Sequence, residues 1–131
     1  NQCMHVCCLV WEIPMIEGEH YTPILYAMYA GKAKKFLNAL NTYFENAHMD
    51  WKCVLDTSAC TYNEIFSGKY QAVIFAPEAK TRQWAYTKEM QSANVPKYYL
   101  DFAEYTEMKL NTLIDFFNKS ENASSVNGES A

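Results

Sequence analysis

The stretch Ala72-Val73-Ile74-Phe75-Ala76-Pro77 decides the fold class. Five apolar residues in a row, stopped by a proline, are typical of a strand buried on both faces, because a strand with one solvent face alternates apolar and polar residues. Strands of this kind occur in parallel sheets that helices cover. The sequence therefore predicts an α/β domain built around this strand.

Three further apolar runs, each bounded by turn residues, predict the other strands of the sheet. They are Ile24–Met28, Trp51–Leu55 and Val95–Leu100. We expect Ile24–Met28 to be the first strand and to run through a tight loop at Gly31 directly into a helix. A separate run of strand-favouring residues, Met4–Ile13, predicts an extra N-terminal strand.

Helical patterns follow the predicted strands at 24–28 and 72–76, and a further one lies near the end of the chain. The first has one apolar stripe at three- and four-residue spacing, formed by Ala33, Phe36, Leu37, Leu40, Tyr43 and Phe44. Two more helices are expected at about 78–92 and 104–117. Strands that alternate with helices predict a parallel sheet with right-handed crossovers.

The 131 residues fit one domain, which we place at 22–118. Residues 1–21 are expected to be an N-terminal extension, either the end of a preceding domain or an added edge strand. Residues 119–131 are rich in Ser, Asn, Gly and Glu, a composition that predicts a disordered tail.

Composition restricts the partners. A net charge of -4 argues against a nucleic-acid face, which needs clustered positive charge, and no uncharged run is long enough for membrane insertion. The sequence predicts no metal site and no cofactor, because no His or Cys group has ligand spacing. No secretory signal pattern precedes Val6–Trp11, and reduced thiols in a cytoplasmic protein best explain the five cysteines, Cys3, Cys7, Cys8, Cys53 and Cys60.

Ligands of open parallel sheets sit at the carboxyl ends of the strands, which here means the loops at 29–34, 56–60 and 77–80. The first of these loops is a candidate anion site, because a glycine and lysines at a helix start can combine free amides with charge. The alternative is a solvated first helical turn. The candidate residues are Tyr29, Ala30, Gly31, Lys32, Ala33 and Lys34.

Three blocks of the sequence resemble the enzyme IIB components of bacterial sugar phosphotransferase systems, of the lactose/cellobiose type. The first is Ile24-Leu25-Tyr26-Ala27-Met28-Tyr29-Ala30-Gly31, where the family has a strand, a cysteine and a small-residue loop. The second, from Tyr70 to Glu78, looks like the family's strand ending in Ala-Pro-Gln. The third runs from Val95 to Asp101 with Tyr105 beyond it. Together the blocks span about Pro23 to Phe117.

The resemblance implies a four-stranded parallel sheet in the flavodoxin-like order 2-1-3-4 and a role in phosphoryl transfer during sugar transport. In the family, a cysteine after the first strand takes phosphate from a histidine of enzyme IIA and passes it to sugar held by the membrane enzyme IIC. The matching position here is Met28. A thioether cannot form a phosphocysteine, so the resemblance implies a degenerate active site with no catalytic residue at the expected position.

Other residues could still serve this site. Cys8 and Cys7 are the fallback nucleophiles, if Met4–Ile13 were the family's first strand; buried, idle thiols are the alternative. Ser58, Pro77 and Glu78 are expected at the rim. Glu78 stands where the family has glutamine and would repel phosphate, although an acidic residue also suits the start of a helix.

Two functions remain open at this point. The first is an enzyme IIB-like protein of carbohydrate uptake, whose partners would be enzyme IIA and enzyme IIC. The second is a non-catalytic regulatory or dimerisation module derived from enzyme IIB, such as part of a transcriptional regulator. The added segment 1–21 also predicts self-association, as a homodimer, or partner binding through its extra strand.

Overall fold

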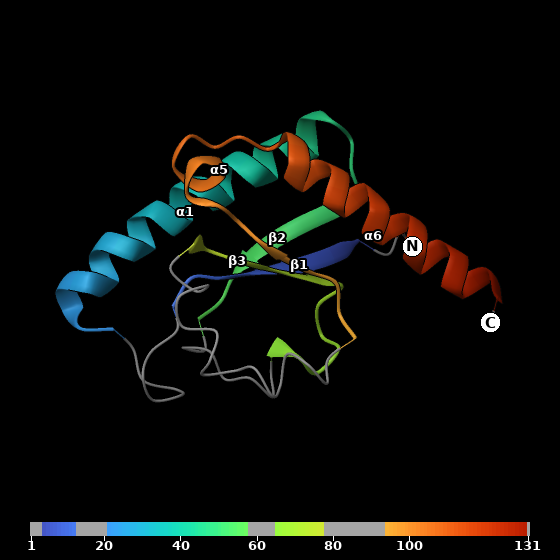
Figure 1. Cartoon of the computed structure of the whole chain (residues 1–131), viewed down its shortest axis with the longest axis horizontal. Helices are drawn as coiled ribbons and strands as arrows, with labels where there is room; N and C mark the ends of the chain where they lie inside the picture. The colour runs from blue at the N-terminus through green and yellow to red at the C-terminus, as the bar shows by residue number, and fades with distance from the viewer. Residues whose placement is uncertain (1–3, 13–20, 58–64, 78–93, 131) are drawn as a thin grey trace.

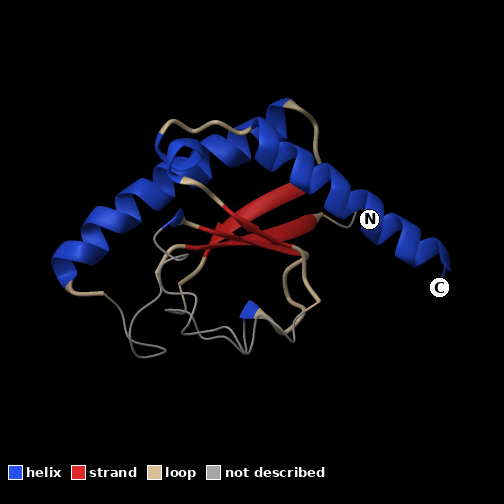
Figure 2. Cartoon of the chain, viewed as in Figure 1, coloured by secondary structure: helices blue, strands red, loops and turns tan. Residues whose placement is uncertain are grey.

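The computed structural model describes residues 4–12, 21–57, 65–77 and 94–130 of the chain. Its strands and helices are drawn in Figures 1 and 2. The strands are β1 (His5–Val10), β2 (Trp51–Leu55), β3 (Ala72–Phe75) and β4 (Lys97–Tyr99). The helices are α1 (Pro23–Asn46), α5 (Phe102–Thr106) and α6 (Asn111–Ser130).

The four strands form one parallel sheet in the order β2-β1-β3-β4. The α/β class and the order 2-1-3-4 are therefore confirmed. In the register, Cys7 of β1 lies between Cys53 of β2 and Ala72 of β3. Residues 72–76 are buried throughout, as the unbroken apolar run predicted.

The identity of the first strand differs from the prediction. The central strand is His5–Val10, paired on both sides, and Ile24–Met28 belongs to α1. Pro23 at the helix start has the fixed φ that a first helical turn needs, and the apolar spacing continues without a break across Gly31. A single glycine inside a helix costs about 1 kcal/mol, which the packing of α1 can absorb. The predicted strand and loop at 24–34 are therefore wrong, and β1 is neither an extra strand nor an edge strand.

Helices α1, α5 and α6 lie on one face of the sheet (Figure 1). Between them and the strands lies the larger core, to which α1 contributes Ala30, Ala33, Phe36, Leu40 and Phe44. The other face of the sheet packs against a smaller cluster that includes Ile65 and the partly buried Phe66, Tyr70, Val95 and Tyr99. The helix predicted at 78–92 lies outside the described residues.

The C-terminal part of the chain forms two helices where the sequence predicted one at 104–117. The break follows from Met108, which has a positive φ of 53° and ends α5, so that the Lys109 amide donates back to the Glu104 carbonyl at 3.0 Å. Helix α6 packs through Leu113, Ile114 and Phe117 and continues to Ser130, over residues whose composition predicted a disordered tail. Propagation of an anchored helix needs only one backbone hydrogen bond per residue, so a polar composition does not by itself stop it.

The end of α1 has the same geometry as the end of α5. The Met49 amide donates to the Phe44 carbonyl at 2.9 Å and the His48 amide to the Glu45 carbonyl at 3.2 Å, which is a Schellman motif. His48 occupies its left-handed position, with φ at 55°. Glycine is the residue usually found there, because a Cβ is disfavoured at positive φ.

Replacing His48 by glycine should therefore stabilise the protein, by about 0.5–1 kcal/mol, since no buried contact of a core residue is lost. Urea unfolding of the native and H48G proteins measures the difference. Met108→Gly tests the same reasoning at the end of α5. A lower midpoint for H48G would show that the imidazole has stabilising contacts that outweigh the backbone strain.

Candidate functional site

At the carboxyl ends of the strands, where a ligand of this fold is expected, the backbone hydrogen bonds of the sheet continue beyond the strands. The Asp56 amide donates to the Leu9 carbonyl at 2.9 Å, and the Ala76 amide donates to the Val10 carbonyl at 2.9 Å. On β4, the Leu100 amide donates to the Phe75 carbonyl at 3.0 Å. The indole Nε1–H of Trp11 donates to the Asp56 carbonyl at 2.8 Å. The ladder thus continues past each strand, and a buried tryptophan fills the space after β1.

Two acidic side chains are buried at this edge. Glu12 follows β1 and Asp56 follows β2, with relative exposures of 0% and 3%. A Glu12 carboxylate oxygen accepts a hydrogen bond from the Tyr21 amide at 2.6 Å, which holds the chain leading into α1 against the end of β1. Buried carboxylates repel an anion strongly, because the surroundings screen charge less than water does.

The fallback nucleophiles Cys7 and Cys8 lie in the middle of β1, and both are fully buried. Burial raises the pKa of the Cys8 thiol, and the nearby Asp56 charge raises it further. The same holds for Cys53, whose pKa is raised by burial and by its neighbour Cys7. The thiolate, which is the nucleophilic form, is therefore disfavoured at Cys8 and Cys53, and all three thiols are buried away from solvent. Cys3 and Cys60 lie outside the described residues.

The candidate anion loop is part of a helix. Met28 and residues 29–34 lie in the second and third turns of α1, where backbone amides donate within the helix and cannot cradle an anion. The helix begins instead at Pro23, after Thr22, whose side chain makes no capping hydrogen bond. Of the rim residues, Pro77 follows β3, while Ser58 and Glu78 lie outside the described residues.

The helical conformation brings together a different set of side chains. Ile24, Met28, Lys32 and Lys35 follow one another at spacings of four, four and three residues, which places them on one face of α1. Ile24 is 81% exposed and Met28 is 50% exposed, and both lysines are exposed. We call this set the α1 stripe. The sequence signal for it was present, but the prediction of a strand at 24–28 concealed it.

The α1 stripe extends beyond the sheet at one end and leads to a small pocket at the other. With 24 residues, α1 is about 36 Å long, whereas a six-residue strand such as β1 spans about 20 Å. The first turns of α1 therefore project past the strands (Figure 1). Lys32 and Lys35 border a pocket of about 210 Å³ between α1 and the α5 region, lined also by Phe36, Tyr105, Thr106 and Met108.

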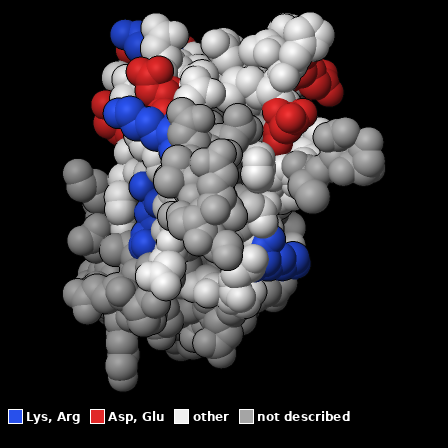
Figure 3. Space-filling view, turned by 90° about the vertical axis from the view of Figure 1, so that its right-hand side faces the viewer, with Lys and Arg blue, Asp and Glu red and all other residues white. Residues whose placement is uncertain are grey.

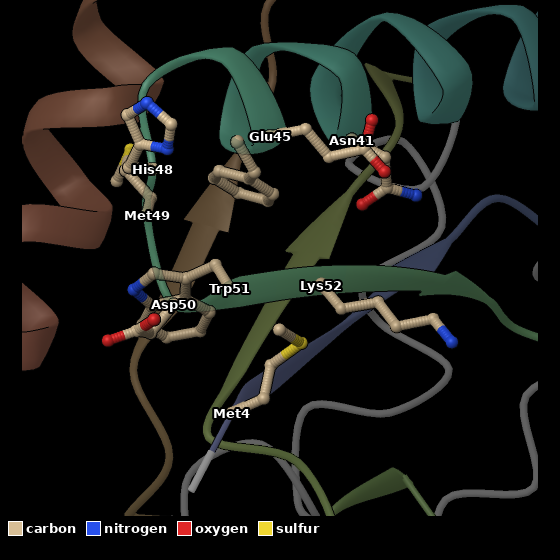
Figure 4. Close-up of a pocket in the computed structure, with 9 residues that line it drawn as sticks. Met4, Asn41, Glu45, His48, Met49, Asp50, Trp51 and Lys52 are labelled. Atoms are coloured by element: carbon tan, nitrogen blue, oxygen red, sulfur yellow. The ribbon is translucent and has the colours of Figure 1, made fainter. Parts of the chain in front are cut away.

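A second pocket lies at the opposite edge of the sheet, where α1 ends and β2 begins. Its volume is about 580 Å³. Figure 4 shows Glu45, His48 and Met49 on one side and Asp50, Trp51 and Lys52 at the start of β2, with Met4 across from them. Asn41 and Phe44 complete the lining. Nothing in the sequence predicted this pocket, because its lining combines Met4, before β1, with residues of α1, the following turn and β2.

The described residues contain no group of three or more His, Cys, Asp or Glu side chains that could hold a metal ion. Among these same residues, no helix has the length and apolar character required to cross a membrane.

Fold and site together define an α/β protein with a four-stranded parallel sheet, two buried acidic residues after β1 and β2 and an exposed helix face. Comparisons with protein-family models, curated proteins and solved structures give no match for this chain.

Proposed function

We propose that this chain is a non-catalytic relative of phosphotransferase enzyme IIB that acts as a protein-binding module, with the α1 stripe as its docking surface. The observation that carries the proposal is the exposure of Ile24 and Met28 beside two lysines on one helix face. A regulatory role in carbohydrate uptake is the corresponding cellular function.

Two features support binding over catalysis. The thiols of β1, Cys7 and Cys8, are fully buried, and the edge where a phosphoryl group would sit holds the acidic side chains of Glu12 and Asp56. A protein of this fold with no accessible thiol among its described residues can still recognise the partner that a catalytic relative would recognise. It would then act in the pathway by binding that partner and keeping it from other proteins.

The charge of α1 indicates the chemistry of the partner. Between Pro23 and Phe44 the helix contains Lys32, Lys34 and Lys35 and no acidic residue, although the chain as a whole is acidic. An acidic surface with a central apolar patch would complement this helix, and electrostatic attraction would speed the encounter. Enzyme IIA carrying a phosphohistidine is a partner with the required negative charge.

The test combines a binding measurement with a phosphorylation measurement. We expect a purified enzyme IIA of the lactose/cellobiose type to bind the native chain and to lose at least tenfold in affinity for Ile24→Glu and for Met28→Glu, because each change buries a charge in the interface. Tyr43→Glu is the matched control, since it alters an exposed aromatic residue on the same helix outside the stripe. Calorimetry measures the affinities, and circular dichroism checks the fold.

In the second measurement, the chain is incubated with phosphoenolpyruvate and the upstream relay proteins and its intact mass is recorded. We expect no phosphoryl adduct. A stable adduct on any cysteine would replace this proposal with the catalytic function of enzyme IIB. Equal binding by native and variant chains would remove the α1 stripe as the docking surface.

A further inference from the structure

The pocket between the end of α1 and the start of β2 has an unusual floor. Trp51 is 3% exposed and packs against His5, Phe44 and Phe117, with ring centroids 5.0, 6.5 and 4.8 Å away. Its indole Nε1–H is buried and has no hydrogen-bond partner among the described residues. A buried donor left unpaired is destabilising, so each such group in a native structure calls for an explanation.

The pocket wall supplies one part of that explanation. In Figure 4 the indole nitrogen of Trp51 lies on the side of the pocket that Asp50 occupies. Asp50 is exposed, and its carbonyl is engaged by the His5 amide at 2.9 Å, so its side chain can turn outward without disturbing the strand. Because the indole N–H is buried, a ligand oxygen can accept its hydrogen bond once a side chain at this edge of the pocket, such as Asp50, moves aside. The floor of the pocket therefore favours a ligand with an exposed oxygen acceptor.

The rim of the pocket favours a cation. Glu45 and Asp50 are acidic and Lys52 is the single lysine of the lining. The last turn of α1 has no basic residue, so the negative end of its helix dipole is not compensated by a side chain of the helix. Figure 3 views the molecule from the end that includes both termini and shows small separate groups of acidic and basic side chains there, with no continuous basic surface among the described residues.

The remaining wall is apolar and adaptable. Met4, which is 52% exposed, and Met49 come from opposite sides of the pocket, and Phe44 also lines it. Thioether side chains adjust to irregular apolar groups. The volume of about 580 Å³ falls in the range of small-molecule sites and has room for a compound of dipeptide size.

We propose that this pocket binds an α-amino amide, the unit found in a free amino-acid amide and at the amino terminus of a peptide. The ammonium group pairs with Glu45 and Asp50 at the rim, the carbonyl oxygen accepts the Trp51 indole N–H, and an aliphatic side chain packs on Met4 and Met49. His48 stands at the edge of the same pocket in its strained left-handed conformation, where its imidazole is a further polar contact.

The probe is leucinamide, followed by nuclear magnetic resonance of the indole N–H groups of the full chain labelled with nitrogen-15. We expect the Trp51 signal to shift downfield with a Kd in the millimolar range, as for a ligand of this size, while Trp11, whose indole is already bonded to Asp56, does not shift. N-acetyl-leucinamide lacks the cation and should bind at least tenfold more weakly. A dipeptide beginning with leucine distinguishes a peptide terminus from the free amide by tighter binding.

Variants assign the contacts. Glu45→Gln should weaken leucinamide binding several-fold, and Trp51→Phe should weaken it while keeping the aromatic packing. His48→Gly is expected to weaken binding although it stabilises the fold, which separates the ligand contact from damage to the structure. Met108→Gly is its matched control, since it relieves the same strain outside this pocket and should leave binding unchanged.

Two results would overturn the proposal. One is a Trp51 signal that does not shift at a leucinamide concentration well above the expected millimolar Kd. The other is equal binding of leucinamide and its acetylated form, because the rim carboxylates would then have no role.

Discussion

Phe117→Ala should lower the free energy of unfolding by about 3–5 kcal/mol, the largest effect we expect from a single change in this chain. Phe117 is fully buried and its ring lies 5.1 Å from Phe44 on α1, 4.8 Å from Trp51 on β2 and 5.2 Å from Phe116. It thus joins α6 to α1 and β2, which lie far from it in sequence. Truncation leaves a cavity between rigid aromatic rings, which cannot collapse to fill it.

Urea unfolding followed by circular dichroism measures this loss. Phe102→Ala is the control, because Phe102 is 62% exposed and the change there should stay within about 0.5 kcal/mol. If Phe117→Ala were as mild as Phe102→Ala, α6 would not pack on the sheet as described, and the larger core would have to be closed by another segment.

The sequence predicted the fold class well for a physical reason. The run at 72–76 is apolar at every position, and only a strand covered on both faces needs that pattern. The strand at Trp51–Leu55 was predicted with its observed bounds. These segments have strong local signals that agree with their tertiary environment.

The first strand was misplaced because two segments had similar local signals. Ile24–Met28 is short, apolar and followed by a glycine, which favours a strand and loop when read alone. In the folded chain its neighbours in the helix, Ala30, Ala33 and Phe36, pack on the sheet and extend the helix backwards to Pro23. Tertiary packing of one helix face therefore decided between the two conformations, and a local pattern contains no information about it.

The residues expected at the candidate site also changed, because the first strand is His5–Val10 and not Ile24–Met28. Once Cys7 and Cys8 lie in the middle of β1, the position that follows the first strand holds Trp11 and Glu12. The buried Glu12 directly follows an apolar run, a signal that was visible in the sequence. The pocket at Trp51 had no such signal, because an unpaired indole N–H is a property of packing.

Asn41→Ala is expected to produce the second largest effect, a loss of about 2–3 kcal/mol. The Asn41 side chain accepts a hydrogen bond from the Cys53 amide at 2.8 Å and donates one to the Cys53 carbonyl at 3.0 Å. Cys53 lies in β2, which is an edge strand of the described sheet, so its backbone groups that face away from β1 have no neighbouring strand among the described residues. Alanine would leave a buried amide and a buried carbonyl unpaired, and each is costly.

Asn38→Ala is the matched control for this measurement, because Asn38 is exposed on the same helix one turn earlier and its loss should change stability by less than about 0.5 kcal/mol. Asn41→Asp separates the two hydrogen bonds. The aspartate can still accept from the Cys53 amide but faces the Cys53 carbonyl with a negative charge, so it should be at least as unstable as N41A at neutral pH. An aspartate variant with native stability would show that only the amide of Cys53 needs a partner.

Asn41 also bears on the assembly state of the chain. An exposed strand edge tends to pair with another chain, and a side chain that bonds both backbone groups in the middle of the edge prevents this. Another chain cannot add a strand beside β1, because β2 and β3 flank it. If N41A both loses stability and forms dimers in light scattering while N38A does neither, the amide of Asn41 serves the fold and protects the β2 edge at once; a destabilised but monomeric N41A would assign it to stability alone.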